Sequence, residues 1–302
     1  MRIIVIGSEG FIGSHLCAHF LKNGYDVYGA DITEPPANTK YRYIKVSRLS
    51  NETEELFRAH VFDYCINAAG SGNVTYSVSH PLMDFEANTL DVIRILDAIR
   101  KVNPGCKYVH ISSAAVYGNP TSLPISETAP LNPISPYGFH KMMSEMICKE
   151  YCSLFAVPVS IIRPFSIFGT GLRKQLFWDI CCKLKKEQSI ELFGTGDETR
   201  DFIHIDDFVL LAEHIMKQSS FNGEVFNAAG GKEISIKAIA EIFERHHSDK
   251  IKINFNGASK KGDPINWKAD MSAVSKTGFS PIAHFEQEVI AYIRWFNTEY
   301  EG

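Results

Sequence analysis

The sequence predicts an α/β fold built on a doubly wound parallel sheet, with a smaller mixed part after it. Three observations predict this class. Short apolar runs alternate with helical patterns through the first half of the chain, a glycine-rich turn separates the first run from the first helix, and an acidic residue ends the second run. Alternating strands and helices give a parallel sheet with helices on both faces, and such sheets bind ligands at the carboxyl ends of their strands. We therefore expect the functional residues at that edge.

The elements of the first half follow from apolar periodicity and from turn residues. Gly24 ends the first helix, and Asn103-Pro104-Gly105 ends the second. The expected strands cover residues 2–7, 26–31, 63–67, 107–113 and 157–163. The expected helices cover residues 11–23, 81–102 and 137–155. This alternation is the one that a doubly wound sheet requires.

The second half of the chain is richer in loops. A helix is expected over residues 206–216, and the segments 235–245, 251–255 and 286–298 complete a mixed C-terminal part. We expect residues 1–165, with residues 204–230 returning to them, to form the sheet domain. Residues 166–203 and 231–302 then form a second, ligand-binding part. Because no flexible linker separates the two, they should pack around one cleft.

Composition excludes several classes of protein. The 302 residues are 45% hydrophobic and 22% charged, as in an average globular protein, which excludes disorder and coiled coils. Lys and Arg number 31 against 35 Asp and Glu, and no basic cluster indicates nucleic acid or a membrane surface as a partner. No run approaches the ~20 apolar residues of a membrane span, so we expect a cytoplasmic protein. The seven cysteines show no metal-binding or disulfide spacing and are expected to be free thiols.

The turn between the first strand and the first helix has the sequence Gly7-Ser-Glu-Gly10-Phe-Ile-Gly13. Glycine is needed where the chain turns sharply and where backbone approaches a pyrophosphate without a Cβ. The N-terminus of the helix then offers free N–H groups and partial positive charge to the phosphates. Asp31 ends the second strand, where a carboxylate accepts hydrogen bonds from a ribose and repels a 2′-phosphate. This pattern predicts a Rossmann dinucleotide site that prefers NAD.

A tyrosine and a lysine lie on one face of an expected helix in Tyr137-Gly-Phe-His-Lys141. A phenol with an ordinary pKa near ~10 is a poor base at neutral pH. A neighbouring ammonium and a cationic nicotinamide ring would both lower that pKa, so the tyrosine could exchange a proton with a sugar hydroxyl. Ser113 ends an expected strand at the carboxyl edge of the sheet, where its hydroxyl can bind the reacting oxygen. These residues occur in the order that one redox site requires, although a Tyr/Lys pair alone is more often a surface feature.

With these motifs the chain resembles the extended short-chain dehydrogenase/reductase family, in its nucleotide-sugar epimerase/dehydratase branch. The resemblance runs from residue 1 to about residue 295. RDFIHIDD is its most discriminating piece, because few other Rossmann families carry it. The matching motifs are GSEGFIG at 7–13, AAG at 68–70, Asn88, SSAAVYG at 112–118, SPYGFHK at 135–141, RPFSIFG at 163–169, GTGDETRDFIHIDD at 194–207 and GDP at 262–264.

The resemblance implies roles for the predicted residues. Tyr137 is the proton-transfer group, Lys141 lowers its pKa and binds the nicotinamide ribose, and Ser113 binds the reacting sugar hydroxyl. The residues expected to bind NAD are Gly7, Gly10, Phe11, Ile12, Gly13, Asp31, Ile32, Ala68, Ala69, Asn88, Tyr137 and Lys141.

For the substrate, the resemblance implies a nucleotide-diphosphate sugar whose diphosphate is held by Arg200. Ser166 stands where members carry an asparagine, and Lys260 stands where arginine is usual before a late Gly-Asp pair. Asp263 of that pair is also expected to contact the substrate. Ser47 lies nearest the position of an aspartate that contacts adenine in the family. These departures put the preferred nucleotide and sugar in doubt.

The three residues before the V-Y-G motif distinguish the reactions that members of the family catalyse. The 4,6-dehydratases carry T-D-E before V-Y-G, and the decarboxylases resemble T-S-E-V-Y-G. Here the corresponding residues are Ser113, Ala114 and Ala115, and a methyl group cannot transfer a proton. The remaining chemistry is epimerisation, reduction or oxidation at one sugar carbon. Asn67 replaces a common histidine before the Ala-Ala pair, for which the sequence offers no physical account.

We expect an NAD-dependent NDP-hexose 4-epimerase that acts through a transient 4-keto sugar. Asp31 argues for NAD, and the residues after it include no basic group to receive a 2′-phosphate. An NDP-4-keto-6-deoxyhexose reductase and a catalytically idle NAD(H)-binding scaffold stay open as alternatives. A homodimer is expected, because the helices over 81–102 and 137–155 carry more apolar residues than one buried face needs.

Overall fold

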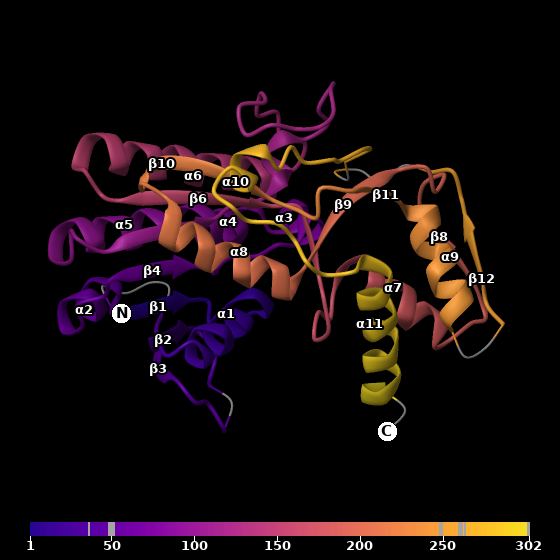
Figure 1. Ribbon diagram of the computed structural model, residues 1–302, viewed down its shortest axis with the longest axis horizontal. Coiled ribbons are helices and arrows are strands. Elements are labelled where there is room, and N and C mark those ends of the chain that lie inside the picture. The colour runs from indigo at the N-terminus through magenta and orange to yellow at the C-terminus, as the bar shows by residue number, and fades with distance from the viewer. Residues whose placement is uncertain (36, 48–51, 248–249, 259–261, 263, 301–302) are drawn as a thin grey trace.

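The structure is a computed structural model that describes residues 1–35, 37–47, 52–247, 250–258, 262 and 264–300 (Figure 1). A seven-stranded parallel sheet forms its N-terminal part, with strand order β10-β6-β5-β4-β1-β2-β3. The predicted doubly wound parallel sheet is confirmed, and its order reverses between β1 and β4. The strands are β1 (Arg2–Ile6), β2 (Asp26–Asp31), β3 (Arg42–Lys45), β4 (Tyr64–Asn67), β5 (Lys107–Ile111), β6 (Val159–Pro164) and β10 (Asn222–Ala228).

Helices cover both faces of this sheet. On one face α1 (Phe11–Lys22) and α8 (Ile205–Gln218) share an apolar core with the strands, through residues such as Leu16 and Phe208. On the other face α2 (Glu52–Ala59), α5 (Asp91–Val102) and α6 (Pro136–Phe155) form a second core. Both cores consist of fully buried side chains, so each face of the sheet is sealed and only the strand ends are left for binding.

The single long helix expected over residues 81–102 is wrong in detail. Three segments replace it: α4 (Pro81–Phe85), a π-helical turn (Glu86–Leu90) and α5. The wide turn buries Asn88, whose side-chain amide donates to the Ser71 carbonyl at 3.2 Å. Apolar periodicity does not distinguish a π turn from an α turn, and such turns are frequent at functional sites.

The C-terminal part contains two small sheets and an aromatic core, on the right of Figure 1. Its helices α7 (Gln175–Leu184), α9 (Ile236–His246) and α11 (Phe285–Tyr300) surround strands that the sequence mostly did not indicate. Those strands are β7 (Ser166–Phe168), β8 (Ser189–Leu192), β9 (Thr199–His204), β11 (Glu233–Ser235) and β12 (Lys252–Phe255). The short helix α10 (Ser272–Ser275) packs back against β10 of the large sheet.

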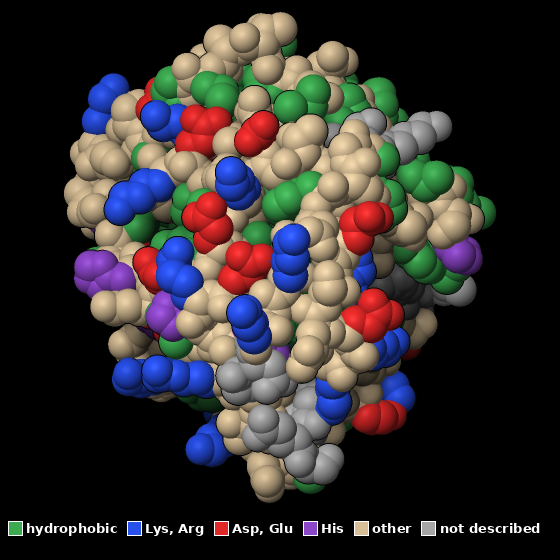
Figure 2. All heavy atoms as spheres, turned by 90° about the vertical axis from the view of Figure 1, so that its right-hand side faces the viewer, with side chains coloured by type: hydrophobic (Ala, Val, Ile, Leu, Met, Phe, Trp, Pro, Cys, Tyr) green, Lys and Arg blue, Asp and Glu red, His purple; other side chains and the backbone are tan. Residues whose placement is uncertain are grey.

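The surface carries mixed charge, and the cysteines are unpaired. Figure 2 shows the face over the C-terminal part, where basic and acidic side chains are interspersed rather than gathered by sign. Within the described part of the chain, no helix combines the length and the hydropathy that crossing a bilayer would require. All seven cysteines are free, and five of them are buried.

Candidate active site

The turn after β1 forms a cradle of close backbone contacts. Gly7 has a φ of +82°, and a Cβ there would lie 2.6 Å from the Ala69 nitrogen. A Cβ on Gly13 would lie 2.0 Å from the Gly7 carbonyl oxygen. Each position excludes a side chain because backbone already occupies the space. The glycines therefore bring the N-terminus of α1 against the loop that follows β4.

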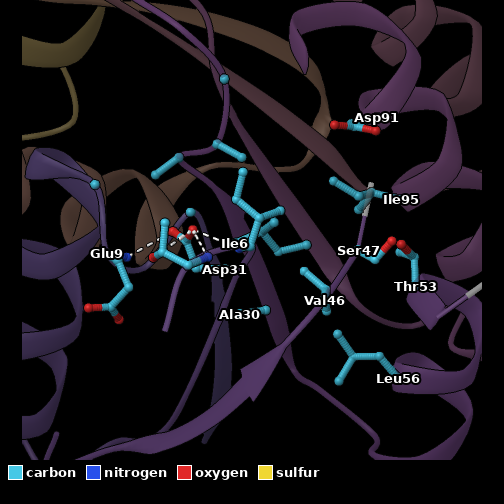
Figure 3. Close-up of a pocket in the computed structure, with 17 residues that line it drawn as sticks. Ile6, Glu9, Ala30, Asp31, Val46, Ser47, Thr53, Leu56, Asp91 and Ile95 are labelled. Carbon is cyan, nitrogen blue, oxygen red and sulfur yellow. Dashed lines mark hydrogen bonds between the residues drawn. The ribbon is translucent and has the colours of Figure 1, made fainter. Parts of the chain in front are cut away.

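A cavity of about 300 Å³ opens beside this cradle (Figure 3). Its walls include apolar side chains from β1, from α2 and α5 and from the segment after β3. Such walls suit the flat adenine ring of a dinucleotide. Ser47 lies on that wall, where the resemblance placed a contact to adenine. Six predicted cofactor residues line the cavity: Gly7, Gly10, Asp31, Ile32, Ala68 and Ala69. Three more, Phe11, Ile12 and Gly13, form the first turn of α1.

Asp31 is held in the cavity by backbone hydrogen bonds. Its carboxylate accepts from the N–H groups of Glu9 at 3.0 Å, Ile32 at 2.7 Å and Thr33 at 3.2 Å (Figure 3). These bonds fix the orientation of the carboxyl group at the end of β2, with acceptor capacity left for ribose hydroxyls. Cradle, apolar wall and carboxylate together fit the expected NAD.

The predicted catalytic residues meet at the carboxyl edge of the same sheet. The expected strand through Ser113 ends at Ile111, and Ser113 instead caps a 3₁₀ turn by accepting from the Ala115 nitrogen at 3.1 Å. The first turn of α6 presents Tyr137 to this serine. Burial raises the pKa of Tyr137 to about 12, and the hydrogen bond from Ser113 only partly offsets this. In the chain by itself, desolvation of the phenolate thus outweighs the help from Ser113; the lowering expected from Lys141 together with a nicotinamide ring stays a prediction.

Lys141 lies one helical turn after Tyr137 and is 5% exposed. Its ammonium donates to the Ile111 carbonyl oxygen at 3.0 Å, which ties α6 to the end of β5. Burial lowers the pKa of Lys141 to about 8, although Asp84 and Glu145 nearby favour its charged form. The lysine therefore stays mostly protonated at neutral pH, within reach of the catalytic edge.

A buried pair that the sequence analysis did not identify lies beneath these residues. His140 Nδ1 is 2.6 Å from an oxygen of Asp84, which is completely buried on α4. Among the described residues, the other Asp84 oxygen has no hydrogen-bond partner. The carboxylate of Asp84 raises the pKa of both Tyr137 and Lys141. The histidine inside the Tyr137–Lys141 motif was the available signal for this pair.

Asn67, which stands where the resemblance expects a histidine, has a structural role. Its amide group donates to the Tyr108 hydroxyl at 2.9 Å, and its amide oxygen accepts from the Ala69 nitrogen at 3.1 Å. These bonds tie the end of β4 to the neighbouring strand β5 and shape the loop that packs on Gly7. The replacement thus keeps the cofactor loop in place with neutral groups.

A buried ion pair supports the serine end of β5. Arg163 donates to both oxygens of Glu145, at 2.8 and 2.6 Å, and to the Tyr117 hydroxyl at 2.8 Å. The Ser112 hydroxyl donates to Glu145 at 2.5 Å. This network connects β5, β6 and α6 directly beside Ser113, and no local sequence pattern indicated it.

The discriminating motif on β9 contains two acidic residues that hold loops in place. Asp201 accepts from the backbone nitrogens of Gly231 and Ala269, each at 3.0 Å, and burial raises its pKa to about 6. Asp207 accepts from the backbone of Ile282 and Ala283, each at 3.0 Å. The motif therefore orders segments far along the chain around its first residue, Arg200.

The predicted substrate residues are brought together only in part. Arg200 donates to the carbonyls of Thr199 at 2.8 Å and Ile265 at 3.1 Å, and Ser166 begins the neighbouring strand β7. Gly262, just before Ile265, packs near Ser135, which caps the helix of Tyr137. Arg200 thus contacts Ile265, and Gly262 lies against the cap of the catalytic helix. Lys260 and Asp263 lie outside the described residues.

Comparisons with known proteins agree with this geometry. The profile of the NAD dependent epimerase/dehydratase family matches residues 3–229. The chain is 28% identical to the putative UDP-glucose 4-epimerase of Methanocaldococcus jannaschii over 98% of both chains, and 28% identical to the UDP-glucose 4-epimerase of Lactobacillus helveticus over 100% and 99%. Among solved structures, UDP-glucuronic acid 4-epimerase from Bacillus cereus, in complex with UDP-glucuronic acid and NAD, superposes with a TM-score of 0.90 at 28% identity, covering 99% of this chain and 100% of that one.

Proposed function

The chain belongs to the NAD dependent epimerase/dehydratase family, and we propose that it is a nucleotide-sugar 4-epimerase. One observation carries the proposal: Tyr137, Ser113 and Lys141 meet beside the dinucleotide cradle, with only methyl groups at Ala114 and Ala115. A dehydratase needs an acid and a base at those two positions. Epimerisation needs only a proton carrier, a group that orients the sugar hydroxyl and a reversible hydride acceptor.

The residues of the chain take the following parts. NAD, when bound, supplies the reversible hydride acceptor. Tyr137 would take the proton of the sugar 4-hydroxyl while C4 gives up its hydride to that acceptor, so that the O–H and C4–H bonds are replaced by the C=O bond of a transient 4-keto sugar. When the hydride returns to the other face of C4, Tyr137 would give the proton back to the same oxygen. Ser113 orients that oxygen, and the charge of Lys141 favours the phenolate that Tyr137 must form. Arg200 keeps hold of the diphosphate while the sugar presents its other face.

The two parts of the chain divide this work in the proposal. Residues 1–165 with 204–230 bind NAD, and residues 166–203 and 231–302 bind the nucleotide sugar. Support comes from the cavity, which is lined by the first part, and from Arg200, which lies in the small sheet of β9. In this proposal the glycine turn and the edge of the large sheet serve the cofactor, and the C-terminal part serves the sugar.

We also propose that two chains pair through α4 and α6. Both helices expose large apolar side chains, including Leu82 at 69%, Met146 at 63% and Met83 at 49%. Exposed apolar patches of this kind mark interaction sites, and a two-fold axis would place them against their own copies. Light scattering that gives the mass of a single 33.9 kDa chain at micromolar concentration would refute the dimer.

The direct test of the function is the stereochemistry at C4. Purified protein with NAD is incubated with a UDP-hexose deuterated at C4, and the products are identified by NMR. We expect the C4 epimer with deuterium retained. Tyr137→Phe removes the proton carrier and keeps the ring, so turnover should fall about 10²–10⁴-fold while NAD stays bound. Net consumption of NADPH with a 4-keto sugar would identify the reductase instead, and no reaction with any sugar nucleotide would favour the scaffold.

A further inference from the structure

A lysine from the C-terminal part reaches the catalytic edge. Lys174 ends the loop between β7 and α7. Its ammonium lies 3.7 Å from the point where a Cβ on Gly72 would be, and the phenol oxygen of Tyr137 lies 4.0 Å from the same point. Gly72 belongs to the loop after β4, beside the dinucleotide cradle. The ammonium and the reacting phenol therefore face the same small volume of the cleft.

This ammonium has no counter-ion among the described residues. Neighbouring cations are satisfied: Arg173 pairs with Glu299 at 3.0 Å, and Lys183 donates to the Glu191 carbonyl at 2.6 Å. Although the Lys174 side chain is exposed, protein atoms surround the ammonium closely enough that desolvation lowers its pKa. A desolvated charge without a partner is unfavourable unless a ligand brings the opposite charge.

The position of Lys174 identifies which anion of a nucleotide sugar it would meet. For the proposed reaction the sugar 4-hydroxyl lies at Tyr137, and C6 is attached to C5, the neighbour of C4. The diphosphate is attached to C1, across the ring from C4, and Arg200 is already placed for it beside Ile265. An anionic group near the reacting hydroxyl is therefore one carried by C6.

We propose that Lys174 binds the C6 carboxylate of the sugar and that the substrate is a nucleotide-linked hexuronic acid rather than a neutral hexose. The proposal rests on the proposed 4-epimerase function and names its substrate class. It also meets an electrostatic need of the reaction. A carboxylate close to Tyr137 would oppose formation of the phenolate, and the ammonium of Lys174 offsets that repulsion. The nearby Ala114 and Ala115 offer no side-chain donor for a carboxylate.

The test compares UDP-glucuronate with UDP-glucose. The two differ only at C6, which is a carboxylate in the first and a hydroxymethyl group in the second. Initial rates of epimerisation give kcat/KM for the wild-type protein, Lys174→Gln, Lys174→Arg and Lys186→Gln. Lys186 is an exposed lysine just beyond the far end of α7 and serves as the matched control. We expect a wild-type preference for UDP-glucuronate. Lys174→Gln should lower kcat/KM for UDP-glucuronate by about 10- to 100-fold, the usual loss for a charged hydrogen bond, and change UDP-glucose less than about threefold. Lys174→Arg should retain most activity.

Binding measurements separate the failure of this proposal from failure of the proposed function. Calorimetric affinities for UDP-glucuronate, UDP-glucose and UDP are compared in the presence of NAD. A carboxylate preference that disappears in Lys174→Gln supports the assignment even if neither sugar is epimerised, an outcome that would refute the 4-epimerase alone. A wild-type preference for UDP-glucose overturns the assignment. So does an equal loss of UDP affinity in Lys174→Gln, because that result would make Lys174 a phosphate ligand.

Discussion

Replacing Lys141 by methionine should make the folded protein more stable at pH 7 while turnover falls steeply. The lysine is 5% exposed, and within the described part of the chain its ammonium donates one hydrogen bond, to the Ile111 carbonyl oxygen at 3.0 Å. Burial lowers its pKa from the ordinary 10.5 to about 8. At pH 7 both the folded and the unfolded chain carry this proton, but the folded chain carries it in a less favourable environment.

The magnitude follows from linkage. A fall of pKa from 10.5 to about 8 corresponds to about 3 kcal/mol of unfolding free energy lost at pH 7. Methionine has a similar length and no charge, and it gives up a hydrogen bond worth about 1 kcal/mol. The net expectation is a gain of about 2 kcal/mol at pH 7. Between pH 8 and 10.5 the folded wild type releases the proton before the unfolded chain does, so wild-type stability rises and the gain of the variant disappears.

Urea denaturation at pH 7 and at pH 10 measures the gain in unfolding free energy at neutral pH and its disappearance at high pH. The matched control is Lys149→Met on the exposed side of the same helix, which should change stability by less than about 0.5 kcal/mol. A variant less stable than wild type at pH 7 would refute the reasoning. A gain of equal size at both pH values would also refute it, because the effect would then not come from the charge.

Three further changes test other parts of the site. Asp84→Asn removes a buried carboxylate that raises the pKa of Tyr137, so the rise of kcat with pH should move about one pH unit to lower pH. Arg163→Met leaves Glu145 buried without its counter-ion, and urea denaturation should show a loss of about 3–5 kcal/mol. Gly13→Ala places a Cβ 2.0 Å from a carbonyl oxygen in the cradle, and the affinity for NAD, measured by fluorescence titration, should fall at least about 100-fold.

Each of these variants has a control that isolates its cause. Glu150→Gln removes an exposed carboxylate from α6 and should leave the pH profile unchanged. The double variant Glu145→Leu/Arg163→Met leaves no buried charge and should recover at least half of the lost stability; no recovery would contradict the desolvation argument. Gly105→Ala adds a Cβ in open space, so a similar loss of NAD affinity there would mean that the Gly13 result is not steric.

The parts of the fold that the sequence predicted are those with strong local patterns. The β2 strand was predicted with its observed bounds, Asp26–Asp31, because a short, mostly apolar run follows the glycine that ends the first helix and closes on an aspartate. The missed elements are short or atypical. β3 has only four half-buried or exposed residues, and α2 begins with the acidic run Glu52–Glu55, whose pattern shows few apolar positions. The π turn at Asn88 was missed because it changes the hydrogen-bond register without changing composition.

The same distinction applies to the site. Ser113, Tyr137 and Lys141 were predicted because each lies in a contiguous motif. The pairs that support them join residues distant in sequence, such as Asp84 with His140 and Glu145 with Arg163. Such contacts depend on how helices pack on the sheet. The periodicity of a single sequence does not indicate which distant residues this packing brings together. The desolvation that raises the pKa of Tyr137 in the chain by itself was also not foreseen, because desolvation depends on the atoms packed around a group, which the sequence does not reveal.

Two carboxylates that the sequence did not indicate, Asp84 and Glu145, keep Lys141 largely protonated at neutral pH. Burial alone would bring the pKa of Lys141 lower still, and Asp84 and Glu145 raise it back to about 8. Arg163 donates to both oxygens of Glu145, and an oxygen of Asp84 is held 2.6 Å from His140 Nδ1. With a pKa of about 8 the lysine is roughly 90% protonated at pH 7, whereas a further fall of one unit would leave about half of it neutral. Asp84→Asn should therefore also lower the maximum rate. The phenolate of Tyr137 forms at lower pH in this variant, but fewer molecules carry the Lys141 ammonium that stabilises it.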